Sequence, residues 1–111
     1  MLKVSAVWVS PVEIENALRE HPAVSDAAVI ARQNETGLTK PMAYIALRQG
    51  FDPISSLAEE LKAFAAGKLS SYKQPEWIEF VDSLPKTATG KVQRFKLRER
   101  LATTEQALRH R

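Results

Sequence analysis

Short runs of hydrophobic residues, separated by polar turn residues, predict three strands in this chain. The runs cover residues 23–31, 41–47 and 77–81, and they are rich in β-branched and aromatic side chains. Because side chains alternate along a strand, Ile78 and Phe80 should share one face of the last run. The first two runs are joined by a short polar turn, so we expect them to pair as antiparallel neighbours.

A helix is predicted to start directly after Ser10. Ser10 suits the N-cap, Pro11 suits the first helical position, and Glu13 would complete a capping box. Glu15 is interpreted as a surface residue, and His21, followed by proline, as the end of the helix rather than a metal ligand. The apolar face of this helix would consist of Ile14, Ala17 and Leu18.

Two further helices follow from apolar residues at helical spacing. Asp52, with a proline behind it, is the predicted N-cap of the second helix, and the third helix should start near Arg94. Its last part, residues 102–111, is expected to be a frayed basic tail. The second helix would bury Leu57, Leu61, Phe64, Ala65 and Leu69, and the third Phe95, Leu97 and Leu101.

The first nine residues suggest a short pair of strands. Val7 and Val9 would lie on one face and Trp8 on the other, with the bend at Ser5 and Ala6. Taken together, the elements predict one α+β domain over residues 1–111. It would contain a small antiparallel sheet of about three strands packed with helices, plus an N-terminal β-hairpin.

Composition narrows the possible chemistry. The chain has 111 residues, which suits one small domain, and it contains no cysteine and only two histidines. A thiolate nucleophile is therefore excluded, and no metal site is expected. No apolar run reaches the roughly 18 residues of a membrane-spanning helix, and no signal peptide opens the chain, so we expect a cytoplasmic protein.

Positive charge is concentrated in the last quarter of the sequence. The net charge is +3, and from Lys86 onward eight basic residues face two acidic ones. Such a region suits a phosphorylated small molecule or nucleic acid. A solvated helix and tail explains Arg109 and Arg111 equally well, and no set of aromatic residues for base stacking accompanies the basic region, so no nucleic-acid partner is expected.

The segment 84–91 is the strongest candidate for chemistry. Its proline, threonines and glycine favour an exposed turn with Lys91 at the tip, where the ammonium group can reach an anionic oxygen. A solvated turn that simply carries a lysine is the alternative. The segment is not a P-loop, because Pro85 and Val92 replace the required glycine and hydroxyl residue. A catalytic Lys91 would therefore act on a substrate held by another part of the enzyme.

Three ordered motifs identify a resemblance. Residues 85–91, 9–15 and 21–24 resemble the C-terminal domain of the adenylate-forming enzymes, which include acyl-CoA synthetases, peptide-synthetase adenylation domains and luciferases. The similarity extends from Met1 to about Leu101. Within the family, residues 2–5, 8–11 and 37–41 look most like those of benzoate-CoA ligases.

The resemblance implies a two-step reaction in a larger enzyme. An acid and Mg-ATP would give an acyl-adenylate, and CoA would then displace AMP to form a thioester. A large N-terminal domain would bind most of ATP, Mg²⁺, CoA and the acid. Lys91 would act in the first step, and the small domain would then rotate and withdraw it. Its supporting loop would be Pro85, Lys86, Thr87, Thr89 and Gly90.

In the second step the resemblance places the N-terminal hairpin beside the pantetheine of CoA. The residues concerned are Val4, Ser5, Ala6, Val7 and Trp8. Ala6 replaces a glycine usual in the family; glycine lets the backbone approach the pantetheine closely, and Ala6 adds one methyl group at that point. The resemblance also implies acetylation of Lys91, with a lysine acetyltransferase and deacetylase as partners. The 111-residue chain alone should be inactive.

Two alternatives remain at this point. The first is the same domain in a ligase for another acid, such as a substituted benzoate or a medium-chain fatty acid. The second is a stand-alone basic module that binds phosphates, with a steep dependence on salt.

Overall fold

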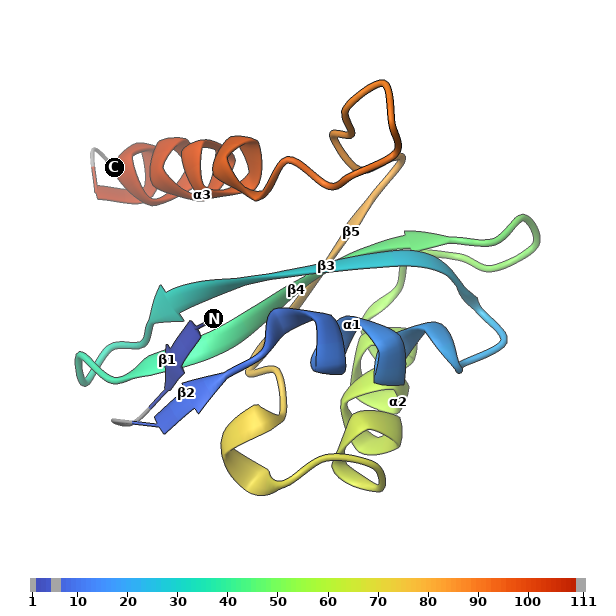
Figure 1. Cartoon of the computed structure of the whole chain (residues 1–111), viewed down its shortest axis with the longest axis horizontal. Coiled ribbons are helices and arrows are strands. Elements are labelled where there is room, and N and C mark those ends of the chain that lie inside the picture. Colours follow the sequence, from blue (N-terminus) through green and yellow to red (C-terminus); the bar gives the residue numbers. More distant parts are fainter. Residues whose placement is uncertain (1, 5–6, 110–111) are drawn as a thin grey trace.

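The chain folds into a three-stranded sheet covered by helices on both faces, with a small hairpin at the N-terminal end (Figure 1). The computed structural model describes residues 2–4 and 7–109. The α+β class and the N-terminal β-hairpin are both confirmed. The elements in order are β1 (Leu2–Val4), β2 (Val7–Val9), α1 (Pro11–Arg19), β3 (Val24–Gln33), β4 (Thr39–Leu47), α2 (Ser55–Ala66), the 3-10 turn η1 (Ser71–Lys73), β5 (Trp77–Val81) and α3 (Arg94–Arg109).

The main sheet has the order β3-β4-β5. Strands β3 and β4 are antiparallel, as predicted. Strand β5 runs parallel to β4, with Met42 opposite Trp77 and Ala46 opposite Val81, so the expectation of a wholly antiparallel sheet was wrong for this pair. The reason lies in the connection, because α2 and η1 carry the chain back along the sheet before β5 begins.

The two faces of the sheet carry separate hydrophobic cores. Helices α1 and α2 cover one face and α3 covers the other (Figure 1). Ile78 and Phe80 pack on the α1/α2 face, as the alternation along β5 predicted, whereas Trp77 and Val81 pack on the α3 face. The α3 face is built from Ala28, Ile30, Met42, Tyr44, Leu84, Leu97 and Leu101.

The N-terminal hairpin belongs to the α1/α2 face. Val4 and Val9 are fully buried in that core, while Trp8 remains 62% exposed. The predicted bend at Ser5 and Ala6 lies outside the described residues. Apolar side chains therefore attach this hairpin to the body of the domain.

Helix α1 confirms the predicted start but not the capping box. Ser10 is the N-cap and a proline opens the helix, yet the Ser10 side chain makes no capping hydrogen bond. Glu13 instead forms an ion pair with Lys73 of η1, with an Oε2–Nζ distance of 2.6 Å. The lysine offers the carboxylate a full positive charge, which is a stronger partner than a backbone N–H.

The ends of α1 and α2 also show long-range contacts. His21 follows α1 and is buried; its Nδ1 accepts the Ala23 N–H, and its Nε2 lies 2.6 Å from Glu60 Oε2 on α2. Helix α2 begins at Ser55 with the extended residue Ile54 as its N-cap, so the predicted cap at Asp52 was wrong. Helix α3 continues to Arg109. Fraying of residues 102–111 concerns motion in solution and stays a prediction.

Candidate active site

The segment between β5 and α3 folds into a tight loop that stands above the α3 face (Figure 1). Within it, Gly90 N–H donates to the Thr87 carbonyl over 2.9 Å, and Thr87 N–H donates to the Lys91 carbonyl over 2.8 Å. The Thr87 hydroxyl accepts the Lys91 N–H over 3.1 Å. Gly90 has a φ of 86°, a conformation that costs glycine little. These hydrogen bonds and the glycine conformation define the position of the Lys91 backbone in the loop.

The base of this loop is closed by backbone pairing and apolar contact. Lys86 and Val92 form an antiparallel bridge, and Gln93 N–H donates to the Pro85 carbonyl over 2.8 Å. Leu84 is buried on the α3 face, and Val92 packs against the same core. The two stems of the loop are therefore held against the domain, and the residues between them stand above its surface.

Lys91 lies directly after the turn at residues 88–90 that forms the tip of the loop. Its side chain is exposed, and none of the ion pairs found among residues 2–4 and 7–109 involves it. The amine is therefore not held inward by a carboxylate of the described chain. An exposed ammonium group on a structured loop is free to approach an anion on another surface.

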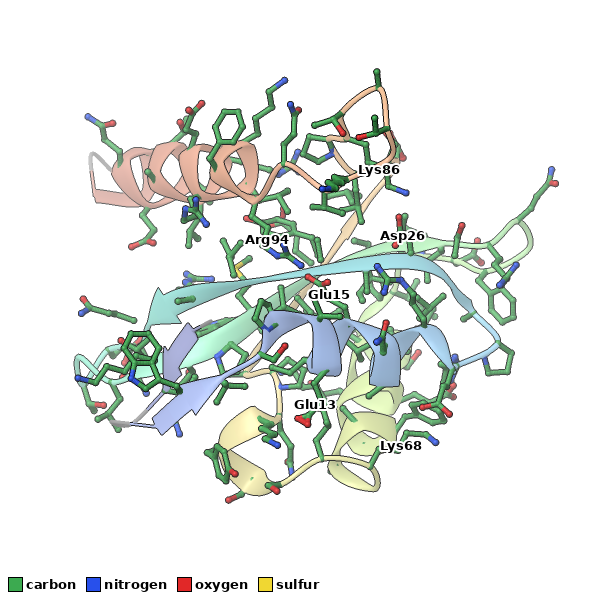
Figure 2. The ribbon with its side chains drawn as sticks, viewed as in Figure 1. Glu13, Glu15, Asp26, Lys68, Lys86 and Arg94 are labelled. Atoms are coloured by element: carbon green, nitrogen blue, oxygen red, sulfur yellow. The ribbon has the colours of Figure 1, made fainter. Side chains whose placement is uncertain are left out.

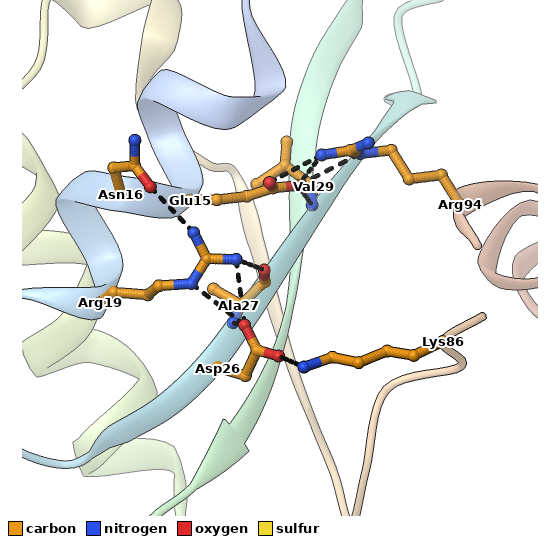
Figure 3. Close-up of polar contacts among 8 residues, drawn as sticks. All are labelled: Glu15, Asn16, Arg19, Asp26, Ala27, Val29, Lys86 and Arg94. Carbon is orange, nitrogen blue, oxygen red and sulfur yellow. Dashed lines mark hydrogen bonds and ion pairs between the residues drawn. The ribbon is translucent and has the colours of Figure 1, made fainter. Parts of the chain in front are cut away.

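Lys86, the other lysine of the loop, lies in a different environment. Its ammonium group pairs with Asp26 Oδ2 on β3, and the opposite oxygen of Asp26 accepts Arg19 Nε over 3.0 Å (Figure 3). Burial by itself would raise the pKa of Asp26. The hydrogen bonds from Lys86, from the Ala27 N–H and from Arg19 outweigh burial and lower this pKa below its usual value. Lys86 thus fastens the incoming stem of the loop to the sheet.

The outgoing stem is fastened by Arg94, the first residue of α3. Its Nη2 lies 2.7 Å from both carboxylate oxygens of Glu15, and its Nε lies 3.2 Å from Oε2 (Figures 2 and 3). Glu15 is only 2% exposed, and Oε2 also accepts the Val29 N–H over 2.8 Å. The interpretation of Glu15 as a surface residue was wrong.

A weak signal for Glu15 was present in the sequence. Leu18 follows it by three residues, so Glu15 lies beside the apolar face of α1. Its partner Arg94 is 79 residues away, and no local pattern connects the two. Sequence reasoning therefore missed this pair.

The structure brings the six predicted loop residues together, but it does not place the hairpin beside them. Val4 and Trp8 lie with the hairpin on the α1/α2 side, whereas the Lys91 loop rises from the α3 side (Figure 1). Ser5 and Ala6 lie outside the described residues, as does the side chain of Val7. The two predicted functional segments thus occupy different faces of one domain.

The best-defined pockets of the domain lie away from the Lys91 loop. A pocket of about 550 Å³ has Arg48, Phe51, Phe80 and Arg100 among its lining residues. None of its lining residues belongs to the loop segment 84–91. Among the residues that were described, no group of three or more histidine and acidic side chains is arranged to hold a metal ion. No helix in that part of the chain has the length and apolar character needed to cross a membrane.

Comparison with known proteins identifies the family of this chain. Residues 13–91 match the sequence model of the AMP-binding enzyme C-terminal domain. The chain belongs to this family. The resemblance seen in the motifs is thereby confirmed, and with it the general class of adenylate-forming acyl-CoA ligase C-terminal domains.

Relatives of this AMP-binding enzyme C-terminal domain include aryl-CoA ligases. It is 55% identical over 98 residues to the benzoate–CoA ligase of Thauera aromatica, covering 88% of this chain and 19% of that protein. It is 48% identical over 101 residues to a 4-hydroxybenzoate–CoA/benzoate–CoA ligase of Rhodopseudomonas palustris, covering 89% and 19%. The chain thus spans about a fifth of the length of these relatives.

Solved structures share the fold. The crystal structure of the anthranilate CoA ligase AuaEII in complex with anthranoyl-AMP superposes with a TM-score of 0.86 at 49% identity, over 94% of this chain and 20% of that one. A benzoate CoA ligase from Burkholderia xenovorans LB400 gives a TM-score of 0.76 at 52% identity, over 86% and 19%. In both cases the match is to a small part of a larger ligase.

Proposed function

We propose that this chain is the mobile C-terminal domain of an ATP-dependent acyl-CoA ligase and that Lys91 is its catalytic residue. The reaction joins an acid and ATP into an acyl-adenylate with release of pyrophosphate, and CoA then displaces AMP to give a thioester. The observation that carries the proposal is the state of Lys91. It is exposed and has no carboxylate partner among the described residues, while Lys86 and Arg94 on either side are both paired.

The proposed substrate is benzoate or a related aryl acid. The names of several relatives support this choice, including two that act on benzoate. A relative named as a 4-hydroxybutyrate–CoA ligase is 46% identical, so the same domain also suits a ligase for another small acid. In this proposal the acid pocket belongs to the larger part of the enzyme, together with most of the contacts to ATP, Mg²⁺ and CoA.

Lys91 acts by electrostatic stabilisation in the first half-reaction. Negative charge develops as the carboxylate attacks the α-phosphate and pyrophosphate departs. An ammonium group already positioned at that point lowers the barrier without having to reorganise solvent. The hydrogen bonds within the loop limit how far the lysine backbone can move from this position.

A rotation of the domain between the two half-reactions would explain how the Lys91 loop and the N-terminal hairpin can both serve one active site. The Lys91 loop and the N-terminal hairpin lie on different faces of the domain, so they would not meet one active site in a single orientation. Rotation between the steps would replace the lysine with the hairpin and place Val4, Ser5, Ala6, Val7 and Trp8 beside the pantetheine of CoA.

The test uses the full-length enzyme and separates the two half-reactions. Lys91→Ala should slow adenylation, measured by ATP–pyrophosphate exchange, by about 10²- to 10³-fold, or about 3–4 kcal/mol. Thioester formation from preformed acyl-adenylate should change much less. Lys96→Ala removes another exposed lysine, from α3, and serves as the matched control. Equal losses in both half-reactions would refute the role of Lys91.

The same exposure makes Lys91 accessible to modification. Acetylation would remove its charge and so silence adenylation. Under this proposal a lysine acetyltransferase and a deacetylase are partners of the enzyme. Mass spectrometry of the protein purified from cells should find acetyl-Lys91 in a fraction with low adenylation activity, and deacetylation should restore that activity.

A further inference from the structure

The two stems of the Lys91 loop are tied to the body of the domain by two ion pairs. Lys86 on the incoming stem pairs with Asp26 of β3, and Arg94 on the outgoing stem pairs with Glu15 of α1 (Figure 3). Arg94 follows Lys91 by three residues. The backbone that carries the lysine is thus held at both ends by carboxylates from distant elements.

Of the two carboxylates, Glu15 is the more deeply enclosed. Its exposed fraction is 2%, compared with 16% for the Asp26 side chain. Glu15 accepts Arg94 through both oxygens and the Val29 N–H through Oε2. A two-pronged contact to a planar guanidinium group defines direction as well as distance. Glu15 therefore joins α1, β3 and the end of the loop at one point.

The Glu15–Arg94 pair is not the sole attachment of α3 to the sheet. Leu97 and Leu101 are buried on the α3 face, and Leu84 anchors the other side of the loop. Apolar burial is favourable in proportion to area and has no preferred direction, whereas the ion pair has a narrow geometry. The ion pair specifies where α3 begins, and hence where Lys91 leaves the domain.

From these contacts we propose that Glu15 is a positioning residue for Lys91, acting through Arg94, with Asp26–Lys86 as a second and more exposed restraint. The inference rests on the proposed role of Lys91 in adenylation. A misplacement of about 1 Å at a reacting group can cost up to about 10²-fold in rate. Loss of the Glu15 charge should therefore affect adenylation and leave the second half-reaction largely intact, because Lys91 is withdrawn in that step.

The main experiment measures Glu15→Gln in the full-length enzyme. Glutamine keeps an acceptor for the Val29 N–H but removes the charge that holds Arg94. We expect kcat for adenylation to fall by about 10- to 100-fold with little change in KM for ATP or the acid, and thioester formation from acyl-adenylate to stay within about twofold. Glu13→Gln is the matched control, because Glu13 lies on the same helix and pairs with Lys73, away from the loop.

A double variant distinguishes positioning from a general loss of structure. If Glu15 acts only through Lys91, adding Glu15→Gln to Lys91→Ala should cause no further fall in adenylation. Multiplied losses, equal losses in both half-reactions, or unchanged adenylation in Glu15→Gln would each overturn the inference. The Lys91→Ala variant by itself tests the proposed function. The role of Lys91 and the positioning role of Glu15 can therefore fail separately.

Arg94→Lys provides a second route if Glu15→Gln does not fold. Lysine preserves the charge next to Glu15 but not the two-pronged contact. The same selective fall in adenylation, with the thioester step retained, is expected. An Arg94→Lys enzyme with wild-type adenylation would count against positioning by this pair.

Discussion

The Lys91 loop and the N-terminal hairpin are attached to the same domain by different sets of interactions. The loop is restrained by ion pairs at Lys86 and Arg94 and by hydrogen bonds around Thr87. The hairpin is held by Val4 and Val9, both buried in the α1/α2 core. Both segments bury apolar side chains, Leu84 for the loop and Val4 and Val9 for the hairpin, but the stems of the loop add ion pairs, whose geometry is directional.

This contrast has a physical basis. Burial of an apolar side chain is favourable in proportion to its area and has no preferred direction. An ion pair between guanidinium and carboxylate contributes less net stability, because desolvation opposes it, but its geometry is narrow. A loop that must present one amine at one place is better served by the second kind of contact.

The largest expected effect on stability comes from the hairpin. Val9→Ala should lower the free energy of unfolding by about 2 kcal/mol, because Val9 is 1% exposed and the substitution leaves a cavity in the core. Urea denaturation monitored by circular dichroism would measure the change. Val12→Ala is the control, since Val12 is 48% exposed and its loss should change stability by less than about 0.5 kcal/mol. Similar losses in the two variants would mean that burial is not what holds the hairpin.

A smaller effect is expected for the turn inside the loop. Thr87→Val removes the hydroxyl that accepts the Lys91 N–H and lies 3.0 Å from the Thr89 hydroxyl. We expect adenylation in the full-length enzyme to fall by about fivefold, which corresponds to about 1 kcal/mol for one exposed hydrogen bond. Thr104→Val, whose hydroxyl bonds only to its own helix backbone, is the control. A larger fall in stability than in adenylation would show that Thr87 serves the fold and not the loop.

The smallest expected effect is on the pH dependence of the free energy of unfolding, and it concerns Asp26. The folded-state pKa of Asp26 lies below its usual value of 3.8, although burial alone would raise it, because Lys86, the Ala27 N–H and Arg19 hydrogen bond to its carboxylate. A depressed carboxyl pKa adds stability above about pH 4, and that stability is lost as the pH falls through the folded-state value. Asp26→Asn should therefore reduce stability at pH 7, and the difference from wild type should shrink as the pH falls through the lowered folded-state pKa.

Unfolding titrations at several pH values would test this and sharpen the comparison. The difference between wild type and Val9→Ala should stay nearly constant with pH, because no titratable group is removed. A constant difference for Asp26→Asn as well would contradict an electrostatic role for Asp26.

Local patterns in the sequence predicted much of the fold. The bounds of β5, the start of α1 directly after Ser10 and the start of α3 at Arg94 follow from nearby residues, and the structure agrees. The turn at Gly90 was also visible, because glycine and threonine favour it over a few residues. The start of α2 was missed, because Asp52 looked like a good cap while the chain stays extended up to Ile54.

The sequence by itself determined the class of fold, the position of most elements, the turn that carries Lys91 and the resemblance to the family. These features depend on spacing over a few residues, which a linear chain records directly. Only the tertiary structure decided that β5 runs parallel to β4, that Glu15 is buried against Arg94, and that Lys86 is paired with Asp26 while Lys91 is exposed. Each of these depends on groups far apart in the chain, and their Coulomb and packing energies exist only once the fold has brought them within contact distance.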